Sequence, residues 1–210
     1  MARGTLTKHD YAAAAFDFVD EHGLESLTMR SLGEKMGVDP TAVYRHFPTK
    51  EGLVNALVDR LLAAVREDAA ARPGDTPRDR IRNFAWAMRE QVRRHPGIGV
   101  IIPVSSGESE NGYFCSRMIL DALADMGLRD QDLIVTYQSL EGFVMGSCVQ
   151  DFTGAPRNWQ IRRVRYRAFG VPGIDAAAST TDGVREIADA AFDQGLTTLI
   201  DLAAARATAG

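Results

Sequence analysis

Apolar residues recur along most of this chain at spacings of three and four, the pattern of helices with one buried face. The first predicted helix follows Thr7, a residue type suited to capping, and ends at Gly23. Its apolar face is formed by Tyr11, Ala14, Ala15, Phe18 and Val19. No alternation of apolar and polar residues is strong enough to predict a strand, so the pattern favours an all-α protein.

Residues 27–50, LTMRSLGEKMGVDPTAVYRHFPTK, predict two short helices joined by a tight turn. The first ends near Met36, and Gly37 follows it where a left-handed C-cap favours glycine. The second begins at Pro40 after the capping residue Asp39, because a missing N–H costs nothing at the first helical position. Such a helix-turn-helix can place its second helix in the major groove of DNA.

The outer face of this second helix carries side chains that can bond to DNA. Arg45 can read a base edge or hold a phosphate, and Tyr44 and Thr41 suit phosphate oxygens or a thymine methyl group. Lys50 opens the next predicted helix, where a phosphate is favoured. A plain helical hairpin buried in a core is the alternative that the spacing alone also fits.

The same stretch resembles the N-terminal domain of the tetracycline-repressor (TetR) family of bacterial transcriptional regulators. The resemblance rests on LTMRSLGEKMGV, on the T-x-x-Y-R-H-F run from Thr41 to Phe47, and on Lys50, and it is specific over roughly residues 8–60. It implies a homodimer that binds operator DNA through this motif, and a larger helical domain that binds a small molecule. The matching DNA-facing positions are Thr28, Arg30, Thr41, Ala42, Tyr44, Arg45, His46 and Lys50.

The rest of the chain predicts a larger helical domain. A long helix from Lys50 to about Arg72 can touch both domains and link them mechanically. Further helical segments are predicted at residues 77–95, 98–104, 113–126, 132–152 and 184–205, with a flexible arm at 1–6 and loops at 105–112 and 170–183. The basic residues 157–169 predict a helix or an excursion that covers the partner subunit, with a second nucleic-acid patch as the alternative. We therefore place a DNA-binding domain at residues 1–50 and a ligand-binding and dimerisation domain at residues 51–210.

Small residues at helical spacing predict a subunit interface. Gly142 and Gly146 each cost a helix about 1 kcal/mol relative to Ala, and close approach of a second helix is the usual compensation. Two helices from each subunit would meet across a two-fold axis, which implies a palindromic operator. The predicted interface residues are Val135, Ser139, Gly142, Gly146, Val149, Ala188, Ala191, Phe192, Gly195 and Leu199. The alternative is that the small residues of both helices pack against other helices of the same subunit.

Apolar and soft side chains on three helices predict a cavity for an apolar, aromatic or polycyclic effector. Gln138 and Glu141 stand among them, and a ligand could supply the partners that these polar groups need if they are buried. The predicted walls are Phe84, Met88, Phe114, Met118, Tyr137, Gln138, Leu140, Glu141, Val144 and Met145. The alternative is an ordinary core in which the two polar groups meet water or another helix.

Composition is that of a globular protein, with 45% hydrophobic and 25% charged residues among 210. The net charge of −4 does not by itself indicate DNA binding, which has to depend on the local placement of a few cations. Cys115 and Cys148 are expected to be buried, reduced thiols. The sequence has neither a signal-peptide core nor a run of about 18 apolar residues, so we expect a cytoplasmic protein without membrane contact.

Catalytic motifs are absent from the sequence. The four histidines have no metal-site spacing to one another, to Cys or to carboxylates, and there is no G-x-S-x-G, Walker or dinucleotide motif. We therefore expect no cofactor and no enzyme activity, and predict a homodimeric repressor that binds operator DNA and a small-molecule effector. A helical enzyme and a protein-binding adaptor are the alternatives, and neither should give a sequence-dependent mobility shift with DNA.

Overall fold

A computed structural model describes residues 6–104, 109–152, 157–170 and 180–209. Every regular element in these ranges is a helix, which confirms the all-α class. The α-helices are α1 (Lys8–His22), α2 (Met29–Met36), α3 (Pro40–His46), α4 (Lys50–Ala70), α5 (Pro77–Arg94), α6 (Pro96–Gly99), α7 (Glu110–Asp125), α8 (Asp130–Phe152), α9 (Arg157–Ala168) and α11 (Thr181–Ala209), and the 3-10 turns are η1 (Leu24–Ser26) and η2 (Ile102–Val104). The predicted arm and most of the predicted loop at 170–183 lie outside the described residues.

Capping boxes begin the first two helices. The hydroxyl oxygen of Thr7 accepts the N–H of Asp10 at 3.3 Å, and the Asp10 carboxylate accepts the N–H of Thr7 at 2.7 Å. Thr28 and Ser31 exchange the corresponding bonds at the start of α2, both at 2.9 Å. Each pair satisfies two backbone donors that the helix itself cannot use, so these helix starts are set locally.

The turn between α2 and α3 is tight because two glycines permit it. Gly37 adopts the left-handed conformation (φ 65°, ψ 36°) that ends α2. A Cβ at Gly33 would lie 3.0 Å from the carbonyl oxygen of Val38 and 3.3 Å from the nitrogen of Pro40, so any side chain there would push α3 away. Asp39 then caps α3 by accepting the N–H of Thr41 at 2.8 Å. The predicted helix-turn-helix is confirmed, with its bounds within one residue.

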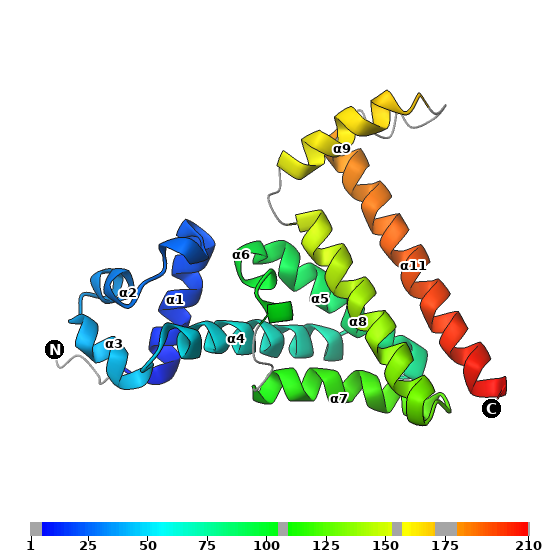
Figure 1. The fold of residues 1–210 in the computed structure, drawn as a ribbon, viewed down its shortest axis with the longest axis horizontal. Coiled ribbons are helices and arrows are strands. Elements are labelled where there is room, and N and C mark those ends of the chain that lie inside the picture. The colour runs from blue at the N-terminus through cyan, green and yellow to red at the C-terminus, as the bar shows by residue number, and fades with distance from the viewer. Residues whose placement is uncertain (1–5, 105–108, 153–156, 171–179, 210) are drawn as a thin grey trace.

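Helix α4 joins the N-terminal three-helix unit to the larger helical body (Figure 1). It packs against α1 near its start and against α5, α6 and α7 further along. Its buried side chains belong to one hydrophobic core that includes residues of α1 and of the larger body. Because the two parts share this core, a shift of α4 changes the packing of side chains in both.

The larger body is built on α4, α5, α7 and α8, and α11 lies across α5 and α8 (Figure 1). Helices α7 and α11 each start three residues earlier than the sequence pattern predicted. Ser109 caps α7 by accepting the N–H of Gly112 at 3.0 Å, and Thr180 accepts the N–H of Gly183 at 3.0 Å at the start of α11. In both cases a polar capping residue extends the helix beyond its apolar stripe.

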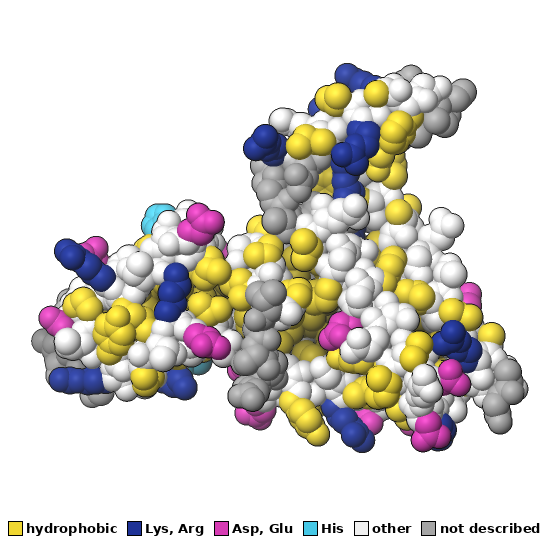
Figure 2. Space-filling model, in the orientation of Figure 1, with side chains coloured by type: hydrophobic (Ala, Val, Ile, Leu, Met, Phe, Trp, Pro, Cys, Tyr) yellow, Lys and Arg dark blue, Asp and Glu magenta, His cyan; other side chains and the backbone are white. Residues whose placement is uncertain are grey.

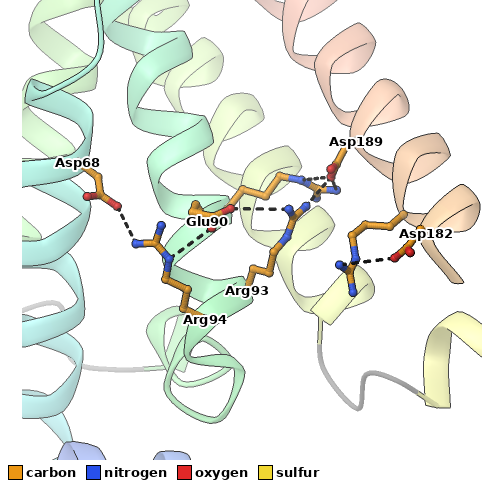
Figure 3. A network of polar contacts seen from close by, with 8 residues as sticks. Asp68, Glu90, Arg93, Arg94, Asp182 and Asp189 are labelled. Atoms are coloured by element: carbon orange, nitrogen blue, oxygen red, sulfur yellow. Dashed lines mark hydrogen bonds and ion pairs between the residues drawn. The ribbon is translucent and has the colours of Figure 1, made fainter.

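Ion pairs fasten α11 to α5 (Figure 3). The Arg89 side chain is almost fully buried and its Nη2 donates to Oδ1 of Asp189 at 2.8 Å, which Arg93 Nη2 also approaches at 2.6 Å. One turn further along α11, Oδ1 of Asp193 lies 2.5 Å from Nη1 of Arg82. These arginines present a basic face of α5 to an acidic face of α11, and this sets how the two helices lie against each other.

Candidate nucleic-acid interface and effector cavity

The predicted DNA-facing residues lie on α2, α3 and the first turn of α4, at the end of the molecule farthest from α11 (Figure 1). Val43 and Phe47 are 0% and 1% exposed and hold α3 from behind. On its outer side Thr41 and Arg45 are exposed and Tyr44 is 52% exposed. A short, firmly braced helix with a polar outer face is what major-groove reading requires.

The other predicted contacts are partly engaged within the chain. Thr28 is the cap of α2, and Nε of the exposed Arg30 donates to Glu34 at 3.0 Å. His46 is half-buried, and its ring lies 4.8 Å from the Tyr11 ring, centroid to centroid. Ala42 is half-buried as well. The exposed cation Arg45 is therefore the side chain of α3 best placed to read a base.

The two exposed helix starts differ in the charges beside them. The Thr41 hydroxyl and then the Thr41 N–H bond to Asp39, and these hydrogen bonds hold the pKa of Asp39 below its ordinary value. The N-terminus of α3 is thus already matched by a carboxylate, which disfavours a phosphate there. Helix α4 is capped by the neutral Thr49 and opens with exposed Lys50, which exposed Glu51 follows. Without a carboxylate cap, its N-terminus disfavours a phosphate less than that of α3.

A cavity of about 170 Å³ lies between α4, α5, α7 and α8. Its walls include Leu62 of α4, Ile102 of η2 and Leu196 of α11, none of which is among the predicted wall residues. Figure 2 shows apolar side chains gathered on the surface over this part of the molecule. Seven of the ten predicted wall residues line the cavity: Phe84, Met88, Tyr137, Leu140, Glu141, Val144 and Met145.

The other three predicted walls require a correction, since Phe114, Met118 and Gln138 lie outside the lining. Phe114 is 45% exposed, and the guanidinium carbon of Arg66 lies 5.0 Å from its ring centroid. Helix α7 instead lines the cavity with Cys115 and Ile119, each one residue after a predicted wall, and with Gly112 and Ser116. Because α7 is apolar on two sides, its spacing pattern could not decide which side faces inward.

Polar groups in the cavity form one short chain. The Tyr137 hydroxyl lies 3.0 Å from Oε1 of Glu141 and 3.1 Å from the Ser116 hydroxyl oxygen. Burial raises the pKa of Tyr137, a rise that the Ser116 hydrogen bond opposes and the Glu141 charge reinforces. Burial also raises the pKa of the Cys115 thiol to about 11, so it stays protonated at neutral pH. Cys115 and Cys148 are both buried free thiols, as predicted.

The predicted interface residues divide into two groups. On α8, Val135, Ser139 and Val149 are exposed, and a Cβ built on Gly142 or Gly146 would meet no atom within 4 Å. This face of α8 is therefore uncovered in the single subunit. The small residues along it leave room for another helix to approach closely.

On α11 the structure corrects part of the predicted interface. Ala188 and Phe192 are buried inside the subunit, and a Cβ at Gly195 would lie 2.5 Å from the ring of Phe143 on α8. Side chains that are already covered cannot be buried again by a partner. Leu199 is half-buried against the same core, which leaves Ala191 as the exposed member of the predicted α11 set.

The described ranges contain no group of three His, Cys, Asp or Glu side chains arranged to hold a metal ion. None of their helices combines the length and the hydropathy needed to cross a bilayer.

Two parts of the chain match known sequence families. Residues 12–57 match the family described as bacterial regulatory proteins, tetR family, and residues 70–204 match the tetracyclin repressor-like C-terminal domain. A curated relative, the tetracycline repressor protein class A from transposon 1721 of Escherichia coli, is 27% identical over 196 residues. The match covers 90% of this chain and 86% of that protein.

Solved structures show the same architecture over nearly the whole chain. BioQ of Mycobacterium smegmatis superposes with a TM-score of 0.69 at 28% identity, covering 96% of this chain and 99% of that chain. BioQ with its natural double-stranded DNA operator gives a TM-score of 0.67 at 25% identity, with the same coverage. Apo ActR of Streptomyces coelicolor gives 0.76 at 21% identity, covering 99% of each chain, which is a likeness of fold.

Proposed function

Because this chain belongs to the tetR family of bacterial regulatory proteins, we propose that it is a transcriptional repressor that binds a palindromic operator as a homodimer. The observation that carries the proposal is the exposed polar face of α3, braced by buried Val43 and Phe47, within the family-matched residues 12–57. A similar protein, BioQ, has been crystallised with its operator. The named relatives are regulators, and we assign this chain no catalytic role. Its site of action is then the cytoplasm, where bacterial operator DNA lies.

We assign the DNA contacts by exposure and charge. Arg45 reads a base edge, because its guanidinium can bond a guanine with two hydrogen bonds. Tyr44 and Lys50 hold phosphates, and Thr28, Arg30, Thr41, Ala42 and His46 complete the contact surface as positioning residues. The DNA-binding domain at residues 1–50 and the ligand-binding and dimerisation domain at residues 51–210 remain our division of the chain.

We place the dimer interface on the uncovered face of α8 together with the outer face of α11. The α8 part comprises Val135, Ser139, Gly142, Gly146 and Val149, and the α11 part is centred on Ala191. Leu202 on α11 is 49% exposed and extends the same outer face. Burying these apolar groups against a second copy supplies the driving force for association.

We propose that a small molecule in the cavity lowers operator affinity. The relative named above is a tetracycline repressor, and the cavity of this chain is lined mainly by apolar side chains from α5, α7 and α8. Leu62 of α4 lines it too, so the helix that enters the DNA-binding domain forms part of the site. A ligand that favours one position of α4 changes the spacing of the two reading helices in a dimer, with typical coupling of about 1–3 kcal/mol.

The test is operator binding by fluorescence anisotropy, using duplex DNA from upstream of the protein's own gene. Arg45→Ala should cost about 1–3 kcal/mol and relax specificity at one base. Lys50→Ala should weaken binding to all sequences and reduce the slope of log affinity against log salt by about one. Arg165→Ala, which removes an exposed arginine on α9, is the control and should change neither quantity.

Two results would count against the proposal. Unchanged affinity in both Arg45→Ala and Lys50→Ala at matched salt would refute the assigned contacts. No sequence-dependent binding by the unaltered protein would favour the adaptor or enzyme alternatives.

A further inference from the structure

We infer that the effector is a cation with an apolar, ring-containing body, held by Glu141 at the mouth of the cavity. This inference rests on the proposed function, because it names the chemistry of the molecule that the cavity takes. Its basis is the charge of the lining. Glu141 is the one charged side chain among the described residues that line the cavity, and no Lys, Arg or His stands with it.

The carboxylate of Glu141 is available to a ligand. Its one hydrogen bond among the described contacts comes from the Tyr137 hydroxyl, 3.0 Å from Oε1. A phenol has one proton, so when Tyr137 donates to Glu141 the Ser116 hydroxyl, 3.1 Å away, donates to Tyr137. The second carboxylate oxygen of Glu141 has no bond within the described part of the chain. Glu141 takes part in no ion pair within the described residues.

Position favours a ligand whose charge sits at one end. Glu141 is exposed, whereas Leu140 and Val144 beside it on α8 are buried. A ligand can therefore place its apolar body among the inner walls and its charged group at the rim. The half-buried rings of Phe84 and Tyr137 add faces toward which a cation is attracted.

Other charges near the cavity leave the sign of this field unchanged. Arg66 and Asp59 on α4 both act on the Cys115 thiol, but they have opposite signs. A cationic ligand thus enters a site whose uncompensated charge is negative. A neutral ligand would shield Glu141 from water without replacing its hydration, and an anion would be repelled.

The experiment measures binding of three probes of similar size by isothermal titration calorimetry. The probes are 10-methylacridinium, the neutral 10-methylacridone and the anion acridine-9-carboxylate. The unaltered protein should bind the cation about tenfold or more tighter than the neutral probe, the size expected from the Coulomb attraction between the ring charge and the Glu141 carboxylate at a partly screened site. Glu141→Gln, which keeps the shape and removes the charge, should abolish that preference and leave the neutral probe within about twofold.

Asp132→Asn is the matched control, because it removes an exposed carboxylate from the same helix away from the cavity. It should leave all three affinities unchanged. Equal binding of the cation and the neutral probe would overturn the inference, as would unchanged cation binding in Glu141→Gln. Failure of all three probes to bind would overturn it too. Loss of operator recognition alongside preserved charge selectivity would instead refute the proposed function and leave the cation site standing.

Discussion

Asp59 of α4 and Asn111 of α7 are joined by two hydrogen bonds. The backbone N–H of Asn111 donates to Oδ1 of Asp59 and its side-chain amide donates to Oδ2, each at 3.0 Å. Asn111 lies in the first turn of α7, where backbone N–H groups lack helical partners and a carboxylate is favoured. One turn further on, Cys115 and Ser116 line the cavity. The helix that forms one cavity wall is thus bonded directly to the helix that enters the DNA-binding domain.

Breaking this contact should weaken the link between the cavity and DNA. We expect Asp59→Ala to keep operator affinity without ligand within about threefold, but to reduce the effector-induced loss of affinity by about fivefold, the size of one or two hydrogen bonds. The measurement is operator anisotropy with and without 10-methylacridinium. Asp121→Ala, which removes a carboxylate from the Arg117 pair elsewhere on α7, serves as control. An unaltered effector response in Asp59→Ala would show that coupling runs through other contacts.

The uncovered face of α8 predicts how a glycine substitution acts on assembly. Gly146→Leu has space within the single subunit, so it should leave the fold intact and give a monomer in sedimentation velocity. Gly195→Leu is the contrasting variant. A Cβ there would strike the Phe143 ring, so it should lower the melting temperature instead. A dimer that persists in Gly146→Leu and still binds DNA would place the interface elsewhere.

The ion pairs between α5 and α11 predict that losing a buried pair costs more stability than losing a surface pair (Figure 3). Asp189→Ala should destabilise the protein by on the order of 2 kcal/mol, because it takes the carboxylate partner from buried Arg89. Arg89→Met combined with Asp189→Ala should recover much of the loss, since the buried charge of Arg89 is then removed together with its partner. Urea unfolding measures both. Asp182→Ala, which breaks a 4.0 Å surface pair with Arg185, should cost less than about 0.5 kcal/mol, and a larger cost would contradict this account.

The raised pKa of the Cys115 thiol predicts that this side chain is alkylated slowly. In a Cys148→Ala background, iodoacetamide should label Cys115 much more slowly at pH 8 than it labels an unfolded thiol, because burial keeps the pKa at about 11. Since the folded thiol holds its proton up to a higher pH than the unfolded one, stability should fall as pH rises from about 9 to about 11. Mass spectrometry and unfolding curves report the two effects. Rapid labelling of the folded protein at pH 8 would contradict the burial of this group.

Much of the helix-turn-helix could be predicted because the residues that begin and end its helices act locally. Thr28, Gly37 and Asp39 act through hydrogen bonds and backbone conformation within a few residues, and each ends or begins a helix where the sequence pattern placed it. Gly33 likewise marks a close approach between elements only a few residues apart. The starts of α7 and α11 were missed because Ser109 and Thr180 cap helices before any apolar stripe begins.

The helix-turn-helix, the all-α class and most of the α5 and α8 walls of the cavity could be predicted from the sequence alone. Helix α5 carries one clear apolar stripe, which leaves it a single face to turn inward. Which side of α7 faces the cavity could be seen only in the folded chain, because Phe114 and Cys115 belong to stripes of similar hydrophobicity. The same holds for the approach of the Phe143 ring to Gly195 and for the bond between Asp59 and Asn111. These contacts join residues distant in the chain, and their free energy depends on how whole helices pack together, which no local pattern encodes.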